Sequence, residues 1–421
     1  MRKTLPIIAF LLSVALQVCA QQKNYDFQEG KLFYKIIDAT KQYVQVTTEL
    51  DELLEATGTL YNSPIKGDVA IPANVNYQGK QYTVTGIGDN AFGGCTQVTS
   101  VSMPASITSL GEQVFLSCTG LKRITVDSNN TVLKDVDGVL FDKSGNKLIA
   151  YPNMRATNYD IPEGTVELGA ASFFMCNEIK NINFPPTLKK IGMLAFGICS
   201  KMNEVTIPET VTDLGDFAFY NCTGLEKAII KANISELKRY MFSRCTALKE
   251  VSLPSTIEFI RTWAFGSCAA MKNIKLPDNL KGIEAEAFNG CETLSEITLP
   301  ASLEQIGMYT FDGCKQLKCI TCLRDTPLKG AAMGAGVFEN VDKIACELKV
   351  PKGHRNEYAE AEQWGDFTRI SEHDLSGIST IISQDSNTQT TIFTINGQRL
   401  PNNTQPSHGI YIVNGKKVCV K

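Results

Sequence analysis

The sequence predicts an α/β repeat solenoid, in which similar coils stack on one another and share a continuous core. Three residue types recur with one 23-residue period, and a fixed period of this length is the signature of a repeat architecture. The first type is cysteine, at Cys95, Cys118, Cys176, Cys199, Cys222, Cys245, Cys268, Cys291 and Cys314. A phenylalanine stands three positions before each of these cysteines. Proline keeps the same spacing, at Pro162, Pro185, Pro208, Pro254, Pro277 and Pro300.

The repeating unit reads L-x-x-I-x-L-P-x-x-I-x-x-I-G-x-x-A-F-x-x-C-x-x, and residues 248–270 are a good copy of it. Its first part alternates, which predicts a short strand with its apolar side inward. The proline then ends the strand, because it has no N–H to donate. The part I-G-x-x-A-F-x-x-C spaces apolar residues by three and four, which predicts a turn and a short helix or 3₁₀ segment.

Residues 1–20 have the pattern of a secretory signal peptide with cleavage after Ala20. A short basic start, Arg2 and Lys3, precedes an apolar run that is too short to span a bilayer. An alternative is lipid anchoring through Cys19, since residues 16–19 loosely match a lipobox. Both interpretations predict an extracytoplasmic protein, either secreted or at the cell surface.

Changes in the spacing of apolar residues and in composition divide residues 21–421 into several expected regions. Residues 21–66 contain two alternating segments and predict an N-terminal β cap. The solenoid is expected over residues 67–370, with a C-terminal cap near 326–370. The interval from Cys118 to Cys176 is more than twice the period, and its Gly- and Asn-rich extra segment predicts an inserted β-hairpin near 125–158. A polar linker at 371–390 and a C-terminal β tail at 391–421 with Asn-Gly turns complete the chain.

The unit resembles the repeats of the BspA-like family of bacterial leucine-rich-repeat surface proteins. The resemblance rests on nine copies of the motif quoted above and covers roughly residues 25–370. The unit departs from the general leucine-rich pattern, in which Asn or Cys comes shortly after L-x-L, because proline takes that place here. The resemblance implies a right-handed leucine-rich-repeat solenoid. The tail at 391–421 resembles a shortened form of the C-terminal sorting domains of secreted bacterial proteins, which makes it a candidate sorting signal.

Composition and motifs argue against most chemistry. The net charge is −3, and removal of residues 1–20 takes it to −5, which does not suit a nucleic-acid partner. The three histidines, His354, His373 and His408, all lie beyond position 350, so a histidine mechanism in the body of the protein is excluded. No nucleophile, base and orienting group occur together, and we expect no enzyme activity, no cofactor and no metal site.

Two cysteine patterns bear on this expectation. The periodic cysteines are interpreted as a column of small buried side chains, the usual place of free cysteine, rather than as disulfides. The pair Cys319 and Cys322 has zinc-like spacing but lacks a second pair of ligands. In register, Cys322 replaces the core residue Leu299 and Cys319 matches the exposed Glu296, so the two are not expected to share a metal.

One surface column stands out. The position just before the alanine of the repeat carries mostly large side chains, at Leu194, Phe217, Tyr240, Trp263, Glu286 and Tyr309. Tyr and Trp are enriched at binding hot spots, so Phe217, Tyr240, Trp263 and Tyr309 are the candidate partner-binding residues. The structural alternative is that these rings lie flat and cover the core.

The resemblance implies adhesion through protein–protein contact. We therefore expect a leucine-rich-repeat binding protein, an adhesin for host matrix or cell-surface proteins or for other bacteria. Two alternatives from other classes remain: a glycan-binding accessory protein, and a structural component of the envelope. No later apolar stretch is long enough to span a membrane. The ligand itself cannot be read from the repeats, because solenoids share a scaffold and differ in their surface residues.

Overall fold

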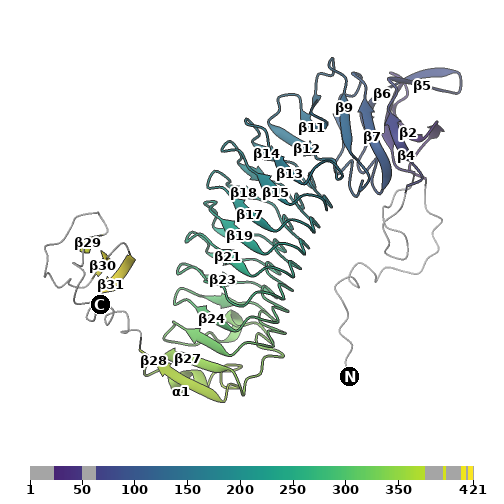
Figure 1. Cartoon of the computed structure of the whole chain (residues 1–421). Coiled ribbons are helices and arrows are strands. Elements are labelled where there is room, and N and C mark those ends of the chain that lie inside the picture. The colour runs from purple at the N-terminus through teal and green to yellow at the C-terminus, as the bar shows by residue number, and fades with distance from the viewer. Residues whose placement is uncertain (1–22, 50–62, 375–391, 395–408, 414–415, 421) are drawn as a thin grey trace.

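A computed structural model describes residues 23–49, 63–374, 392–394, 409–413 and 416–420. Residues 63–374 wind into a curved solenoid of short strands, and a mixed sheet that includes residues 27–47 and 74–87 lies at its N-terminal end (Figure 1). The expected signal peptide, the alternative anchor at Cys19 and most of the expected linker lie outside the described residues. The solenoid and its 23-residue spacing are confirmed, since strands of successive coils pair in that register.

The N-terminal part contains two sheets. The first has the order β1–β2–β3–β6–β5, with the short β8 also paired to β6. Its strands are β1 (Phe27–Glu29), β2 (Leu32–Asp38), β3 (Tyr43–Thr47), β5 (Asn74–Tyr77), β6 (Lys80–Ile87) and β8 (Ser109–Leu110). The second sheet is parallel and consists of β4 (Lys66–Ala70), β7 (Gln97–Met103) and β9 (Arg123–Val126). Together they enclose one hydrophobic core, which includes Tyr34, Val84 and Phe92.

Three antiparallel strands follow and divide the solenoid into two stacks. They are β10 (Leu133–Val136), β11 (Val139–Asp142) and β12 (Lys147–Ala150). Neighbouring side chains of a strand point to opposite faces. On β11, Leu140 accordingly packs into the N-terminal core, whereas Phe141 packs into the core of the following coils. The solenoid therefore has two hydrophobic cores, with this insert as the shared wall.

The second stack presents two rows of parallel strands. The row that we call the strand face consists of β13 (Asn158–Asp160), β15 (Asn181–Asn183), β17 (Glu204–Ile207), β19 (Lys227–Ile230), β21 (Glu250–Ser252), β24 (Glu296–Leu299), β26 (Cys319–Cys322), β27 (Glu347–Pro351) and β28 (Arg369–His373). The second row consists of β14 (Glu167–Leu168), β16 (Lys190–Ile191), β18 (Asp213–Leu214), β20 (Glu236–Leu237), β22 (Phe259–Ile260), β23 (Gly282–Ile283) and β25 (Gln305–Ile306).

The expectation of an α/β solenoid is wrong in its helical part, because the structure is mostly β. Where a short helix was expected, each coil has consecutive turns, and we call this side the turn face. Only every second N–H there bonds within its own coil. The N–H of Ala195 donates to the Gly192 carbonyl at 3.2 Å, whereas that of Phe196 donates to the Ala218 carbonyl of the next coil at 2.8 Å. A helix would need all of them internally, so the spacing of three and four was misleading.

Two columns of side chains fill the core beneath the turns. From Phe173 to Phe338 the rings of successive coils stack nearly parallel, with centroids 4.9 to 5.9 Å apart. The periodic cysteines are buried and free, and from Cys199 onward each thiol donates to the phenylalanine carbonyl of the preceding coil, as Cys222 does to Phe196 at 3.0 Å. Both columns are structural.

The C-terminal end of the second stack is closed by the segment after β27. It contains the only helix of the described residues, α1 (Arg355–Ala359), and a 3₁₀ turn, η2 (Gly330–Ala332), lies upstream of it. Trp364 and Phe367 are buried and meet the ring of Phe338 edge-on at 5.1 and 5.2 Å. The indole N–H of Trp364 donates to the Leu328 carbonyl at 3.0 Å, so its polar atom is satisfied inside this layer.

The tail contains three antiparallel strands, β29 (Ile392–Thr394), β30 (Gly409–Val413) and β31 (Lys416–Val420). Within the described residues, no helix has the length and apolar character needed to cross a membrane. The domain boundaries given above, including those of the caps, the insert and the candidate sorting signal, stay predictions.

Candidate binding surfaces

The structure brings three of the four candidate residues together on the turn face. The rings of Phe217 and Tyr240 stack at 4.6 Å with an angle of 4° between their planes. Tyr240 and Trp263 stack at 6.0 Å and 5°. All three side chains are half-buried. We call Phe217, Tyr240 and Trp263 the aromatic column. Because the rings cover one another's faces, the column presents mainly ring edges to the outside.

Tyr309 lies apart from this column. The intervening coil carries Glu286 at the same position, and no ring contact of Tyr309 occurs within the described residues. Tyr309 is 40% exposed and lies against Gly336 of the following coil, where an added Cβ would be 2.5 Å from the ring. The near-continuous aromatic stripe expected from the sequence is therefore three stacked rings, a carboxylate and one separate ring.

Burial affects the titration of the groups beside the column. It raises the pKa of the Tyr240 hydroxyl, and the nearby Glu286 carboxylate adds to this effect. Burial also raises the pKa of the Glu286 carboxyl, with the Trp263 indole acting in the opposite direction. Both shifts have the same main cause, which is the partial burial of these side chains beside the stacked rings.

The backbone under the column has a conformation that large residues rarely adopt. Phe217, Tyr240, Trp263 and Tyr309 all have φ between 54° and 60°, in the left-handed region. This conformation costs about 1–2 kcal/mol in a residue other than glycine. It is held because each N–H donates to the next coil, as Trp263 does to the Ala285 carbonyl at 3.1 Å. Trp263 also needs Gly266, since a Cβ there would overlap the indole ring.

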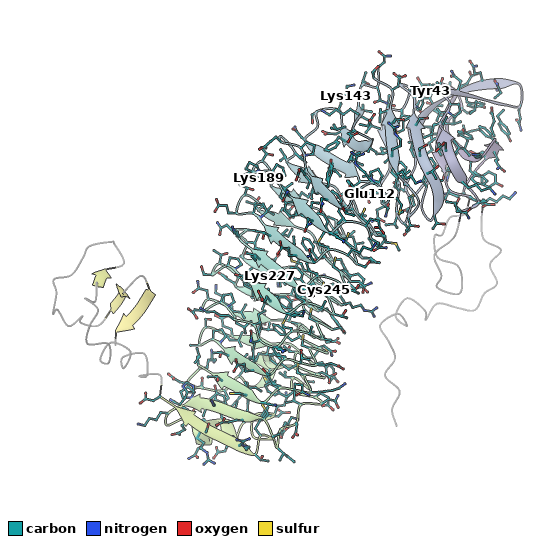
Figure 2. All side chains as sticks on the ribbon, viewed as in Figure 1. Tyr43, Glu112, Lys143, Lys189, Lys227 and Cys245 are labelled. Carbon is teal, nitrogen blue, oxygen red and sulfur yellow. The ribbon has the colours of Figure 1, made fainter. Side chains whose placement is uncertain are left out.

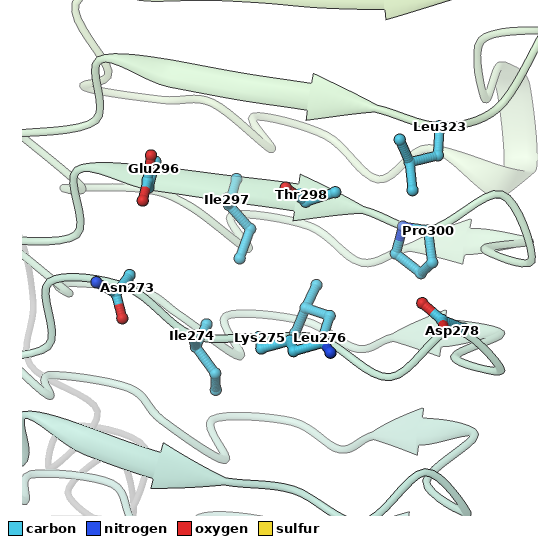
Figure 3. Close-up of a pocket in the computed structure, with 10 residues that line it drawn as sticks. All are labelled: Asn273, Ile274, Lys275, Leu276, Asp278, Glu296, Ile297, Thr298, Pro300 and Leu323. Atoms are coloured by element: carbon cyan, nitrogen blue, oxygen red, sulfur yellow. The ribbon is translucent and has the colours of Figure 1, made fainter. Parts of the chain in front are cut away.

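The strand face is polar and is hollowed where its sheet is interrupted. Residues 273–276 form no strand between β21 and β24, and grooves of about 430 and 370 Å³ lie on either side of this segment. Figure 3 shows the second groove, with Asn273 to Leu276 facing Glu296, Ile297 and Thr298 of β24. A third groove, of about 300 Å³, separates β15 from β17. The rims of all three grooves carry amides and hydroxyls, and those of the first two also carry charges of both signs.

The cysteine pair has the register expected from the sequence. Cys322 pairs with Leu299 and is buried, whereas Cys319 pairs with Glu296 and is half-buried. Across the described part of the chain, no three or more His, Cys, Asp or Glu side chains gather as metal ligands.

A further hollow on the turn face, between the two stacks, was not predicted from the sequence. This hollow of about 490 Å³, which we call the junction cleft, is lined by residues 110–116 on one side and by Lys147, Ile149, Ala150, residues 169–171 and Met193 on the other. The long interval from Cys118 to Cys176 was the one available signal, and it indicated an insertion but not an opening.

Fold and repeat together define the class: a leucine-rich-repeat solenoid. The family model described as the BspA type leucine rich repeat region matches in six copies, over residues 73–146, 147–272 and 264–358. The chain belongs to this family.

Among solved structures, one match supports the fold directly. A leucine-rich repeat protein from Eubacterium ventriosum is 22% identical with a TM-score of 0.52, and the match covers 68% of this chain and 93% of that one. A leucine rich cell surface protein from Faecalibacterium prausnitzii is 20% identical with a TM-score of 0.44, covering 82% and 98% of the two chains. No curated protein sequence matches significantly.

Proposed function

We propose that this protein is an extracytoplasmic, non-catalytic binding protein, an adhesin that holds a protein partner on its turn face. The observation that carries the proposal is the aromatic column: three large rings stand in successive coils at a left-handed position that disfavours them. Leu194 and Glu286 have the same left-handed φ at this position, so the position by itself does not call for a ring, and a use for the rings accounts for three of them in a row. Tyr309 extends the surface two coils further.

The geometry favours a protein over a glycan as the partner. Sugars bind to aromatic residues through an open ring face, whereas the faces inside the column are covered by neighbouring rings. The exposed ring edges, with Glu286 and Tyr309 beside them, offer an apolar strip with polar atoms at intervals. Such surfaces are typical of protein hot spots, where Trp and Tyr bury their rings and keep a hydrogen-bonding tip.

The test is a binding screen of the full chain against immobilised matrix glycoproteins and purified glycans at physiological salt. We expect saturable binding to a protein, weakened about tenfold or more by Trp263→Ala and by Tyr240→Ala. Phe259→Ala is the matched control, because Phe259 is a half-buried ring in the same coil as Trp263 but lies on β22 of the second row and not on the turn face. Binding to glycans alone, or protein binding that these two variants leave intact, would overturn the proposal. Unfolding curves of all variants check that lost binding is not lost folding.

A further inference from the structure

The junction cleft lies where the first stack ends. In the second stack, from Ala171 to Gly313, three alternate N–H groups of each turn donate to carbonyls of the coil that follows. The first stack begins the same way. The N–H groups of Asn90, Phe92 and Gly94 donate to carbonyls of residues 112, 114 and 116, at 3.0, 2.9 and 2.9 Å. One repeat further along the chain, the corresponding donors are those of Gln113, Phe115 and Ser117.

Gln113 and Phe115 line the cleft, and none of the three donors meets a following coil. Among the described residues, the N–H groups of Gln113, Phe115 and Ser117 make no hydrogen bond to a backbone or side-chain acceptor. The insert β10–β12 follows β9, where the N–H of Ile124 donates to the Gly138 carbonyl, and it pairs through β12 with β14 of the second row, but it supplies no acceptor to these three donors. Figure 2 labels Glu112, at this wall of the cleft, along the same edge of the solenoid as Cys245 of the turn face.

The opposite wall differs, because the insert satisfies the second stack. The N–H of Tyr151 donates to the Ser172 carbonyl at 2.8 Å, and the side-chain amide of Asn153 donates to the Phe174 carbonyl at 2.9 Å. The Tyr151 ring stacks on Phe173 at 4.8 Å and so begins the ring column of the second stack. The two stacks therefore meet asymmetrically: the second has a covered first coil, and the first has an open last coil.

The ring at the end of the first stack is also less covered than the ring at the end of the second. Phe115 stacks on Phe92 at 5.4 Å, and no other ring contact of Phe115 occurs in the described part of the molecule. It is 9% exposed, whereas Phe338, at the end of the second stack, is covered by Trp364 and Phe367 and is 1% exposed.

The rim of the cleft carries little net charge. The charged residues that line the cleft are Glu112 and Lys147, one of each sign. The Lys147 ammonium is already paired with the Glu167 carboxylate at 2.9 Å. The cleft therefore offers backbone donors and an aromatic ring rather than a site for an ion.

We propose that the junction cleft binds an extended peptide segment of a partner protein that carries a large apolar side chain. Carbonyl groups of the segment accept hydrogen bonds from the N–H groups of Gln113 and Phe115, as carbonyls of a following turn would. The apolar side chain of the segment stacks on the ring of Phe115 and so continues the ring column. Pairing of an extended peptide with unpaired backbone groups is an established mode of recognition. A volume of about 490 Å³ lies within the range of binding pockets and suits a short stretch of chain.

This site is separate from the aromatic column. None of the residues that line the cleft belongs to the column, so either proposal can fail while the other holds. The segment is assigned to a partner because the balanced rim and the backbone donors select an uncharged extended chain. Occupation by an undescribed segment of this same chain is one outcome of the test.

A matched pair of variants isolates the cleft. Ala170 is an exposed residue of its wall, and Arg239 and Met308 hold the same position in other coils, so the fold accepts long side chains there. Ala170→Arg should fill the cleft without disturbing the coil. Ala285→Arg makes the same change at the same position of a coil that has a neighbour on each side, and it serves as the control.

The probe is a displayed library of random short peptides, selected on the full chain. We expect enriched peptides that share one large apolar residue, bind about tenfold or more weaker to Ala170→Arg, and bind normally to Ala285→Arg. Amide hydrogen exchange should slow at Gln113 and Phe115 when such a peptide binds. No enrichment, or equal affinity for all three proteins, overturns the proposal. So does exchange that is already slow in the free chain and becomes fast in Ala170→Arg, since the chain's own segment then fills the cleft.

Discussion

The two stacks of the solenoid are built from the same repeat but end differently. The first stack is covered at its N-terminal side by the antiparallel strands β1–β3 and ends on Phe115 at the junction cleft. The second begins with Tyr151 and ends under Trp364 and Phe367. The difference shows that the repeat itself does not close a solenoid. Each end needs a separate layer, and where the chain supplies none, backbone donors and an aromatic ring are left available.

The largest expected effect tests whether the two cores are independent. Leu140 and Phe141 are adjacent on β11, both buried, and pack into different cores. Phe141→Ala should lower the free energy of unfolding of the second stack by about 3–5 kcal/mol, and Leu140→Ala that of the first by about 2–5 kcal/mol. Hydrogen exchange in mild denaturant assigns the loss to each stack. If either variant loosens both stacks equally, the molecule has a single cooperative core.

The second prediction concerns alkaline pH. Burial raises the pKa of Cys95 to about 11 and that of Cys291 to about 12, from an ordinary value of 9.0. Below pH 9 these thiols are protonated in both the folded and the unfolded chain. Above pH 9 the unfolded chain loses their protons first, so stability falls by about 1.4 kcal/mol per pH unit for each thiol, up to about pH 11 for Cys95 and about pH 12 for Cys291.

This loss of stability at alkaline pH should differ between the two stacks, because they hold different numbers of buried thiols. The second stack holds seven of the periodic cysteines, Cys176, Cys199, Cys222, Cys245, Cys268, Cys291 and Cys314, and the first holds Cys95 and Cys118. Denaturant unfolding at a series of pH values should show a steeper alkaline loss in the second stack, and Cys291→Ala should make that slope shallower. Parallel slopes in the two stacks would contradict the role of the buried thiols.

The smallest expected effect comes from a charge network that only the second stack carries among the described residues. Arg261 bonds the carboxylates of Glu236 and Glu284 at 2.7 and 2.6 Å, and all three side chains are partly buried. Arg261→Ala should cost about 1 kcal/mol, whereas Lys315→Ala, which breaks the exposed pair with Glu292, should change stability by less than about 0.5 kcal/mol.

The network also predicts a loss of stability in acid. Hydrogen bonds from Lys238 and Arg261 lower the pKa of Glu236 below its ordinary 4.5. Burial would raise the pKa of Glu284, but the bonds from Arg261 and Thr262 outweigh it and lower the value. A lowered folded pKa adds stability above about pH 4.5 that is lost as the pH falls. Thermal unfolding from pH 6 to pH 3 should show this loss in the parent chain and a smaller one in Arg261→Ala.

Much of the core could be predicted from the sequence alone. The positions of Phe219, Cys222 and their equivalents follow from the period, because a constant coil length places equal residues above one another. The register of Cys319 and Cys322 against Glu296 and Leu299 follows for the same reason, and β24 and β26 confirm it. The residues of the aromatic column could also be identified from the sequence. Its division by Glu286 into three stacked rings and a separate Tyr309 could not, because it depends on how the side chains pack.

The solenoid, its 23-residue coil and the columns of its core follow from the chain alone, since these features depend on spacing between residues. Other features depend on how the coils pack. Apolar residues spaced by three and four suit either a helix or a row of turns. The chain forms turns because alternate N–H groups donate to carbonyls of the next coil. The same bonds decide where the molecule is open: no local pattern marks Gln113 or Phe115 as different from Asn90 or Phe92. Only the position of the insert leaves their donors without a neighbouring coil.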